Sequence, residues 1–274
     1  MINNILLPTD FSEVANNALR YAIELCKKTE SKLHLFHIKS IPVMDASFPA
    51  ETYQLILQEM EEATKAGFDK LETSYLKSSG ITFELHTATG FVNDEVISFS
   101  KSNNIDLIVM GTTGASGLQE ILVGSNSASV IGKSEIPVLV IPPAYSYTEP
   151  KHILYSSDYN EPEFPAVSRL MFFAELFDSK VTVLHISTEF DKYFDSENNF
   201  FARNKKHIKH ENITVVNKAN TEVTEAIEKF IAEHQVDMLV MAKHSRSFFD
   251  RLFHRSLSKQ MAYHTKIPLL VLHK

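Results

Sequence analysis

Residues 4–38 read NILLPTDFSEVANNALRYAIELCKKTESKLHLFHI, and residues 152–186 read HILYSSDYNEPEFPAVSRLMFFAELFDSKVTVLHI. The two stretches align without a gap at an offset of 148, so that Asp10 matches Asp158 and the closing isoleucines coincide. Each contains an apolar run, an amphipathic segment and a second apolar run, which is the pattern of a strand, a helix and a strand. Self-similarity at this spacing indicates two tandem domains rather than a solenoid of short repeats.

The repeat continues at a shorter offset in the later part of each copy. NIDLIVMGTTG, from Asn104, matches QVDMLVMAKHS, from Gln235, and IPVLVI matches IPLLVL, both at an offset of 131. The second copy has therefore lost 17 residues between its second and fourth strands. Between the copies lies Pro142–Pro150, a linker rich in proline and turn-forming residues. We expect domains over residues 1–144 and 145–274.

Short apolar runs alternate with helical patterns within the first copy. The expected strands are Ile5–Leu7, Lys32–Ile38, Ile81–Thr87, Ile105–Met110 and Pro137–Ile141, and the expected helices are Glu13–Thr29, Glu51–Ser79 and Val92–Ser102. Strands that alternate with helices predict βαβ units and hence an α/β fold with a parallel, doubly wound sheet. Ligands of such sheets bind beyond the carboxyl ends of the strands.

Composition and charge exclude several classes of function. Hydrophobic residues make up 44% of the chain and charged residues 22%, as in soluble globular proteins. The net charge of −7 lies entirely in residues 1–144, because residues 145–274 hold 17 basic and 17 acidic residues. Neither half has the basic excess that nucleic-acid binding requires, and no apolar run approaches the roughly 20 residues of a membrane span.

The amino-terminal sequence and the cysteine content predict a cytoplasmic location. Met1-Ile-Asn-Asn4 has no basic region and precedes no cleavable apolar stretch, so we expect no secretion signal. The single cysteine, Cys26, excludes a disulfide within the chain and agrees with a reducing compartment. Cys26 lies in an amphipathic stretch, which favours a small buried side chain over a reactive thiol.

Residues 111–134 read GTTGASGLQEILVGSNSASVIGKS, which contains two candidate phosphate-binding patterns. The ending resembles a P-loop, but a P-loop would need glycine where Ser127 stands and should directly follow a strand. Gly132 and Lys133 instead precede a strand, so Gly132 is interpreted as a glycine at a helix carboxyl end. The first part follows a strand, and its glycines allow backbone N–H groups to approach an anion near a helix amino end.

Gly111-x2-Gly114-x9-Gly124-Ser125, between a strand ending at Met110 and the run IPVLVIP, resembles the nucleotide-binding signature of the universal stress protein family. The resemblance extends over both copies. It implies two open α/β domains with strand order 3-2-1-4-5. It also implies that the last strands of the two domains pair to form an intramolecular pseudo-dimer.

The same resemblance implies a ligand and its binding residues. In the ATP-binding members of the family, adenine lies near the positions matched by Asp10 and Ile38. The ribose and phosphates lie along the spaced glycines, usually with Mg²⁺ or Mn²⁺. The implied nucleotide-binding residues are Pro8, Thr9, Asp10, Ile38, Met110, Gly111, Thr113, Gly114, Gly124, Ser125 and Asn126.

The second copy departs from the signature. Ala242 replaces the first glycine, Ser245 the second and Arg255 the third, and only Ser256 remains. An arginine side chain occupies the position where a phosphate would need bare backbone. We therefore expect one nucleotide site per chain, in the first domain only.

The second copy also bears on Asp10. Asp10 and Glu13 resemble a helix N-cap and its third-position glutamate, and Asp158 with Glu161 repeats the pattern in the copy without the glycines. Capping of the helix therefore explains Asp10 as well as contact with adenine does. Both interpretations stay open from the sequence.

The loop that replaces the glycines has a charge pattern of its own. Residues 243–255 hold four basic residues and one acidic residue, with aromatic residues among them. One interpretation is a solvated basic turn with inward-packed aromatics. The other is a docking surface for an anionic partner through Arg246, Arg251 and Arg255.

Two histidine pairs, His34-x2-His37 and His207-x2-His210, have metal-like spacing, but no cysteine or clustered carboxylate completes either set. We therefore expect no metal site made of protein ligands alone. His37 and His185 end matched strands, which predicts a shared structural role.

These patterns support two hypotheses of function. No serine–histidine–acid arrangement, metal-ligand set or acid/base pair stands out beside the glycine loop, so we expect at most slow ATP hydrolysis. The first hypothesis is a cytoplasmic ATP-binding stress protein whose nucleotide regulates conformation or choice of partner. The second is a nucleotide-independent interaction or chaperone-like scaffold. A homodimer is left open, and an enzyme is disfavoured because no SGGxDS-type pyrophosphatase loop follows either first strand.

Overall fold

The computed structural model describes residues 1–40, 49–112, 125–157, 164–187, 212–220, 222–243 and 266–273. The strands of the first half are β1 (Asn4–Pro8), β2 (Lys32–Lys39), β3 (Phe83–Thr89), β4 (Leu107–Gly111) and β5 (Val138–Ile141). Its helices are α1 (Glu13–Thr29), α2 (Ala50–Leu71), α3 (Val92–Ser102) and α4 (Ser125–Lys133), and α2 continues as a π-helix over Glu72–Leu76. The second half contains β6 (His152–Ser156), α5 (Phe164–Phe177), β7 (Lys180–Ser187), β8 (Ile213–Ala219), α7 (Val223–His234), β9 (Met238–Lys243) and β10 (Leu269–His273).

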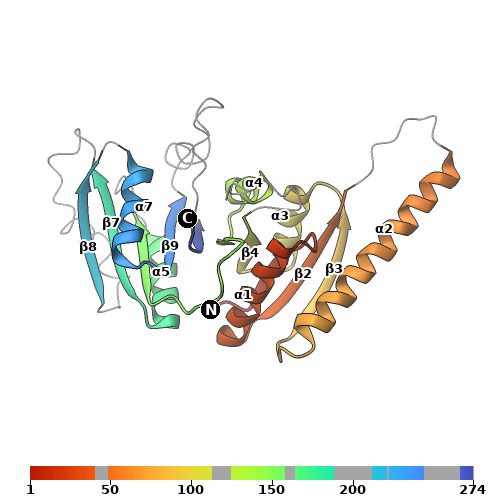
Figure 1. The fold of residues 1–274 in the computed structure, drawn as a ribbon, viewed down its shortest axis with the longest axis horizontal. Coiled ribbons are helices and arrows are strands. Elements are labelled where there is room, and N and C mark those ends of the chain that lie inside the picture. Colours follow the sequence, from red (N-terminus) through yellow and green to blue (C-terminus); the bar gives the residue numbers. More distant parts are fainter. Residues whose placement is uncertain are drawn as a thin grey trace.

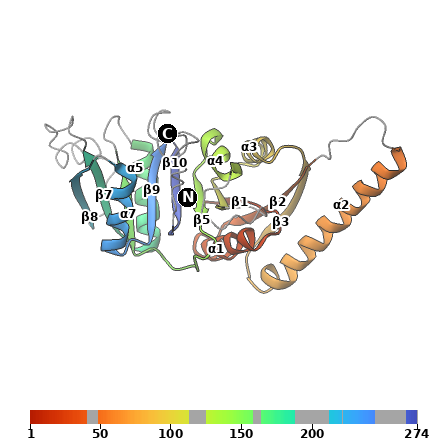
Figure 2. The same cartoon turned by 45° about the horizontal axis from the view of Figure 1, so that its top comes forward.

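All ten strands belong to one sheet, in the order β3-β2-β1-β4-β5-β10-β9-β6-β7-β8. Within each half the strands are parallel in the order 3-2-1-4-5, which confirms the predicted α/β class. The halves meet where β5 and β10 pair antiparallel, with Leu139 opposite Leu270 (Figure 2). The predicted pseudo-dimer through the last strands is therefore confirmed.

The apolar runs explain why the sheet is buried on both faces. Every described side chain of β5 is buried, as is every one of β6, so these strands lie in the interior of the sheet. Helix α1 buries a stripe of small and aliphatic residues, among them Ala18, Ala22 and Leu25, against β1 and β4. Helix α2 lies at the outer end of the first half, beyond β3 (Figure 1).

The expected strand boundaries of the first half agree with the structure to within two residues. Helices α1 and α3 begin and end at the expected residues. β3 covers Phe83–Thr89, so it begins and ends two residues later than expected. Half-buried and exposed positions are mixed along this edge strand, and no continuous apolar run marks its ends. The long helix ends earlier than expected as an α-helix, and Gly80 adopts a left-handed φ of +77° after the π-helical turn.

An aspartate ahead of the fourth strand serves the same purpose in both halves. Asp106 Oδ2 accepts hydrogen bonds from the backbone N–H groups of Asn3 and Asn4, at 2.7 and 3.0 Å. Asp237 Oδ2 accepts from the backbone N–H groups of residues 151–152, at 2.9 and 2.8 Å. Each carboxylate thus satisfies the free backbone donors at the start of the first strand of its half.

The linker between the halves packs against the first domain. Asn17 Nδ2 donates hydrogen bonds to the carbonyl oxygens of Pro142 at 2.9 Å and Tyr145 at 3.0 Å. The ring of Tyr147 packs edge-on against Tyr21, with 4.9 Å between centroids. Burial is the main cause of the raised pKa of Tyr21. A linker held at these points does not behave as a flexible coil.

The single cysteine lies in the core, and the described helices bear on a membrane span. Cys26 is buried in α1, and burial raises the pKa of its thiol to about 12, which confirms the interpretation as a small core residue. Among the described residues, none of the helices combines the length and the apolar character needed to cross a bilayer.

Candidate nucleotide-binding site

The carboxyl ends of β1, β2 and β4 meet at one edge of the first half, because these neighbouring strands are parallel. Pro8 ends β1 and Gly111 ends β4, while Ile38 lies one residue before the end of β2. Thr9, Ile38 and Met110 are buried there and Asp10 is exposed. The fold thus brings together, at the edge where α/β proteins bind ligands, six of the residues implied by the resemblance.

The amino end of α4 is anchored to this edge. Ser127 Oγ donates a hydrogen bond of 2.7 Å to the carbonyl oxygen of Gly111, and Ser127 is 4% exposed. Ser125 is the first residue of α4, and the side chain of Asn126 is exposed. The backbone N–H groups and partial positive charge of the helix start therefore lie next to the end of β4, where an anion can be bound. Sequence reasoning missed Ser127, which it considered only as a departure from the P-loop.

The loop after β1 is held by its own side chains. Thr9 Oγ1 accepts a hydrogen bond from the N–H of Phe11, and Asp10 Oδ1 accepts one from the N–H of Ser12, both at 3.0 Å. These bonds stabilise Phe11 in a left-handed conformation with φ of 63°. The ring of Phe11 packs against His37, with 4.4 Å between centroids. Nothing in the sequence marks Phe11 as a left-handed residue.

The predicted N-cap of α1 is wrong. The cap is Ser12, whose Oγ accepts a hydrogen bond of 3.2 Å from the N–H of Ala15, and Glu13 is the first helical residue. Asp10 lies two residues too early to reach the helix N–H groups. It stabilises the turn that leads into the cap, so Asp10 has a structural role that differs from the one expected.

His37 and His185 have the shared structural role that the sequence predicts. His37 Nδ1 donates to the carbonyl oxygen of Thr9 at 2.9 Å, and His185 Nδ1 donates to that of Ser157 at 3.0 Å. Thr9 and Ser157 are matched residues of the two copies. Each histidine therefore ties the loop after the first strand to the second strand of its half.

Gly111 has a packing role in addition to any role in anion binding. A Cβ atom at Gly111 would lie 2.6 Å from Val14 Cγ1 and 3.1 Å from the carbonyl oxygen of Val14. Glycine therefore allows α1 to approach the end of β4 closely. The same residue is needed for helix packing whether or not a phosphate binds beside it.

Several residues singled out in the sequence lie outside the described residues. They are Thr113, Gly114, Gly124, Asp158, His207, His210, Ser245, Arg246, Arg251, Arg255 and Ser256.

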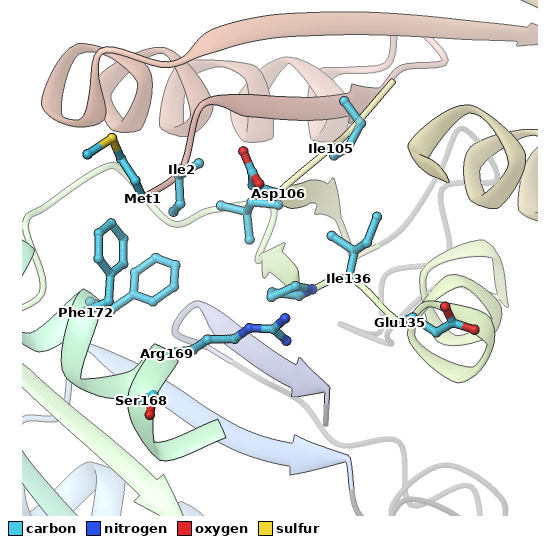
Figure 3. A pocket seen from close by; sticks show the side chains of 12 residues that line it. Met1, Ile2, Ile105, Asp106, Glu135, Ile136, Ser168, Arg169 and Phe172 are labelled. Atoms are coloured by element: carbon cyan, nitrogen blue, oxygen red, sulfur yellow. The ribbon is translucent and has the colours of Figure 1, made fainter. Parts of the chain in front are cut away.

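Two cavities lie away from this edge. One, of about 380 Å³, is lined at the amino ends of β1, β4 and β5 and by α5 of the second half. Figure 3 shows Arg169 extending from α5 into this space toward Ile136. Burial lowers the pKa of the Arg169 guanidinium. The other, of about 390 Å³, lies beside α1 and includes Arg20 and Tyr75. Neither cavity contains a residue of the implied nucleotide set.

Two doubly wound domains that share one sheet through their last strands define a tandem protein of the open α/β class. The chain belongs to the universal stress protein family, because the model of that family matches residues 1–142 and again residues 149–273. The two matched segments correspond to the two halves of the sheet.

The chain is similar to one curated protein and to two solved structures described as universal stress proteins. The chain is 30% identical over 142 residues to universal stress protein MJ0531 of Methanocaldococcus jannaschii, which covers 52% of this chain and 82% of that protein. The crystal structure of a universal stress protein from Archaeoglobus fulgidus covers 100% of this chain and 99% of its own, with a TM-score of 0.75 and 20% identity. A universal stress protein solved in complex with cAMP matches 52% of this chain and 98% of its own, at 20% identity and a TM-score of 0.37.

Proposed function

We propose that this protein is a cytoplasmic universal stress protein that binds ATP, with Mg²⁺ or Mn²⁺, in its first domain, residues 1–144. Bound nucleotide would regulate its conformation or its choice of partner. The observation that carries this proposal is the hydrogen bond from Ser127 Oγ to the Gly111 carbonyl, which sets the start of α4 beside the carboxyl end of β4. A helix amino end at that position suits a phosphate group.

This edge of the sheet offers separate contacts for the adenine and for the phosphates of the nucleotide. Ile38 is 8% exposed and offers an apolar contact for adenine, with Asp10 as a polar neighbour. The phosphates would lie on the N–H groups at the start of α4, near Ser125 and Asn126, together with the glycines of the signature. The divalent cation supplies charge neutralisation of the phosphates. We propose no catalytic base, so any ATP hydrolysis would be slow.

Residues 145–274 would form a domain without nucleotide. Ala242 stands near the end of β9 at the position matched by Gly111, and the remaining glycines of the signature are also replaced. Their replacement removes the bare backbone that phosphates need. The loop with Arg246, Arg251 and Arg255 is a candidate surface for an anionic partner. Binding that persists when all three are changed to serine would remove its basis.

Calorimetry with ATP·Mg²⁺ on nucleotide-free protein tests the proposal. We expect about one site per chain, and we expect Gly114→Val to abolish binding because its side chain would occupy the space of a phosphate. Ser245→Val, at the matched position of the second copy, should leave binding unchanged and serves as the control. Absence of binding heat in the wild-type chain would contradict ATP binding. A mass spectrum of ligands that co-purify with the chain would identify a different nucleotide.

A matched pair of histidine variants tests the location of the site. His37→Leu and His185→Leu each remove one hydrogen bond to a carbonyl oxygen, at a cost of about 1–3 kcal/mol in the free energy of unfolding. Only His37→Leu should also weaken ATP binding, because only the loop after β1 borders the proposed site. Urea unfolding measures the first effect and calorimetry the second. Equal loss of ATP affinity in both variants would argue against a site confined to the first domain.

A second candidate function, a nucleotide-independent chaperone-like scaffold, is favoured by the exposed apolar residues of α2. Tyr53 is 37% exposed, Leu55 60% and Leu57 39%, and the buried residues of α2 lie in its later turns. Exposed apolar side chains on a protruding helix suit contact with unfolded clients. Suppression of client aggregation without ATP, lost when Leu55 and Leu57 become serine, would support this candidate.

A further inference from the structure

Two histidines and one glutamate meet near the amino ends of β2 and β3. His34 on β2 lies opposite Glu84 on β3, and His86 follows two residues later on the same face. His34 Nδ1 lies 3.1 Å from His86 Nε2 and 3.7 Å from Glu84 Oε2, and His86 Nε2 lies 3.5 Å from Glu84 Oε2. Among the described residues, this is the group whose donor atoms all lie within 4.8 Å of one another.

These three distances match the coordination geometry of zinc. Zn²⁺ binds imidazole nitrogen and carboxylate oxygen at about 2.0–2.2 Å in a tetrahedron, whose corners are then about 3.3 Å apart. We propose that His34 Nδ1, His86 Nε2 and Glu84 Oε2 bind a divalent transition-metal ion such as Zn²⁺, with water as the fourth ligand. Two imidazoles and one carboxylate are a ligand set for zinc and other late transition metals rather than for Mg²⁺.

The surroundings of His34 orient the correct nitrogen toward the ion. His34 Nε2 donates a hydrogen bond of 3.2 Å to Asn4 Oδ1. The amide of Asn4 is itself oriented, because its Nδ2 donates to the carbonyl oxygen of Asn104 at 3.3 Å. The proton of neutral His34 is therefore on Nε2, and the lone pair of Nδ1 points into the cluster. Outer hydrogen bonds of this kind fix the tautomer of metal-binding histidines.

The other two ligands are held as well. Lys32 Nζ pairs with Glu84 Oε1, which leaves Oε2 facing the histidines. The ring of Phe99 from α3 packs against His86 with 4.8 Å between centroids and against His34 with 6.1 Å. Burial lowers the pKa of both imidazoles. Without the ion, His86 Nε2–H donates to His34 Nδ1. When the metal ion binds Nε2 of His86, the imidazole takes its other neutral tautomer, with the proton on Nδ1.

The second half of the chain is an internal control. By strand register, the positions of His34, Glu84 and His86 correspond to Thr182, Thr214 and Val216. None of these three is a ligand for a transition metal, so we expect one such site per chain from this arrangement. The cluster lies at the amino ends of the strands, at the edge of the sheet opposite the one proposed for ATP. The metal site proposed here is therefore separate from the site of the Mg²⁺ or Mn²⁺ that accompanies nucleotide.

Zinc titration of the chelator-treated full chain tests this site. We expect His86→Ala and Glu84→Gln each to remove one equivalent of Zn²⁺ binding, or to weaken it by more than the roughly 10–100-fold that loss of an outer partner costs. Glu61→Gln is the control, because Glu61 pairs with Lys39 of β2, as Glu84 pairs with Lys32 of β2, and has no histidine partner in the described part of the chain. Excess Mg²⁺ should not displace the bound Zn²⁺.

Stoichiometry is compared between variants, because the ten other histidines of the chain can bind additional metal ions more weakly. Circular dichroism establishes that each variant is folded, and Glu84→Gln keeps the size and shape of the side chain. Equal stoichiometry and affinity in the wild type, His86→Ala and Glu84→Gln would overturn the proposal. Failure of ATP binding would leave this result unaffected, because the two sites lie at opposite edges of the sheet.

Discussion

Leu270→Asp is expected to lower the free energy of unfolding of the whole chain by at least about 4 kcal/mol. Leu270 is fully buried in β10 and lies opposite Leu139, also fully buried, where the two halves pair. An aspartate there leaves a cavity and an unpaired charge in the interior of a sheet that both halves share. The chain contains no tryptophan, so urea unfolding is best followed by circular dichroism.

The matched control is Leu55→Asp on α2, where the side chain is 60% exposed and the same substitution should change stability by less than about 0.5 kcal/mol. Leu270→Val should cost about 1 kcal/mol, because it removes volume without introducing charge. Both halves of the chain should lose stability together in Leu270→Asp. Unfolding of the second half alone, with the first half as stable as in the wild type, would show that the shared strand pair does not couple the domains.

Gly111→Val is expected to destabilise the first domain by about 3 kcal/mol and to abolish ATP binding as a consequence. The new side chain would collide with the side chain and the backbone of Val14, and backbone cannot move away as a flexible side chain can. Helix α1 would have to shift from the end of β4, which borders the proposed nucleotide site. Thermal unfolding and ATP calorimetry on the same preparation measure the two effects.

Gly132→Ala is the matched control for Gly111. Gly132 lies in the last turn of α4, and a Cβ there would meet nothing within 4 Å. Alanine at a helical glycine should stabilise the chain by about 0.5–1 kcal/mol. Gly111→Val with unchanged stability and reduced ATP affinity would indicate that Gly111 acts on the phosphates alone.

Much of the candidate site could be predicted because it depends on strand ends. Pro8, Ile38 and Gly111 each end or nearly end an apolar run, and the parallel arrangement then brings them to one edge. The N-cap could not be assigned in this way. Asp10 and Ser12 are both good capping residues, and the left-handed Phe11 between them decides which one reaches the helix N–H groups.

The metal cluster could not be predicted from spacing. His34 and His37 look like a pair in the sequence, but they lie on opposite faces of β2, since side chains alternate along a strand. His37 bonds to the loop after β1, whereas His34 faces Glu84 and His86, about 50 residues away. Strand register decides that neighbourhood, and register depends on the whole buried sheet.

The sequence by itself determined the two-domain repeat, the parallel α/β sheets and the shared structural role of matched residues such as His37 and His185. These follow from apolar periodicity and from the alignment of one copy with the other, both of which can be read along the chain without knowing which residues come into contact. Only the tertiary structure decided the contact of Gly111 with Val14 and the meeting of His34 with Glu84 and His86. Such contacts join residues that are distant in sequence, and their geometry is set by how helices and strands pack around a shared core.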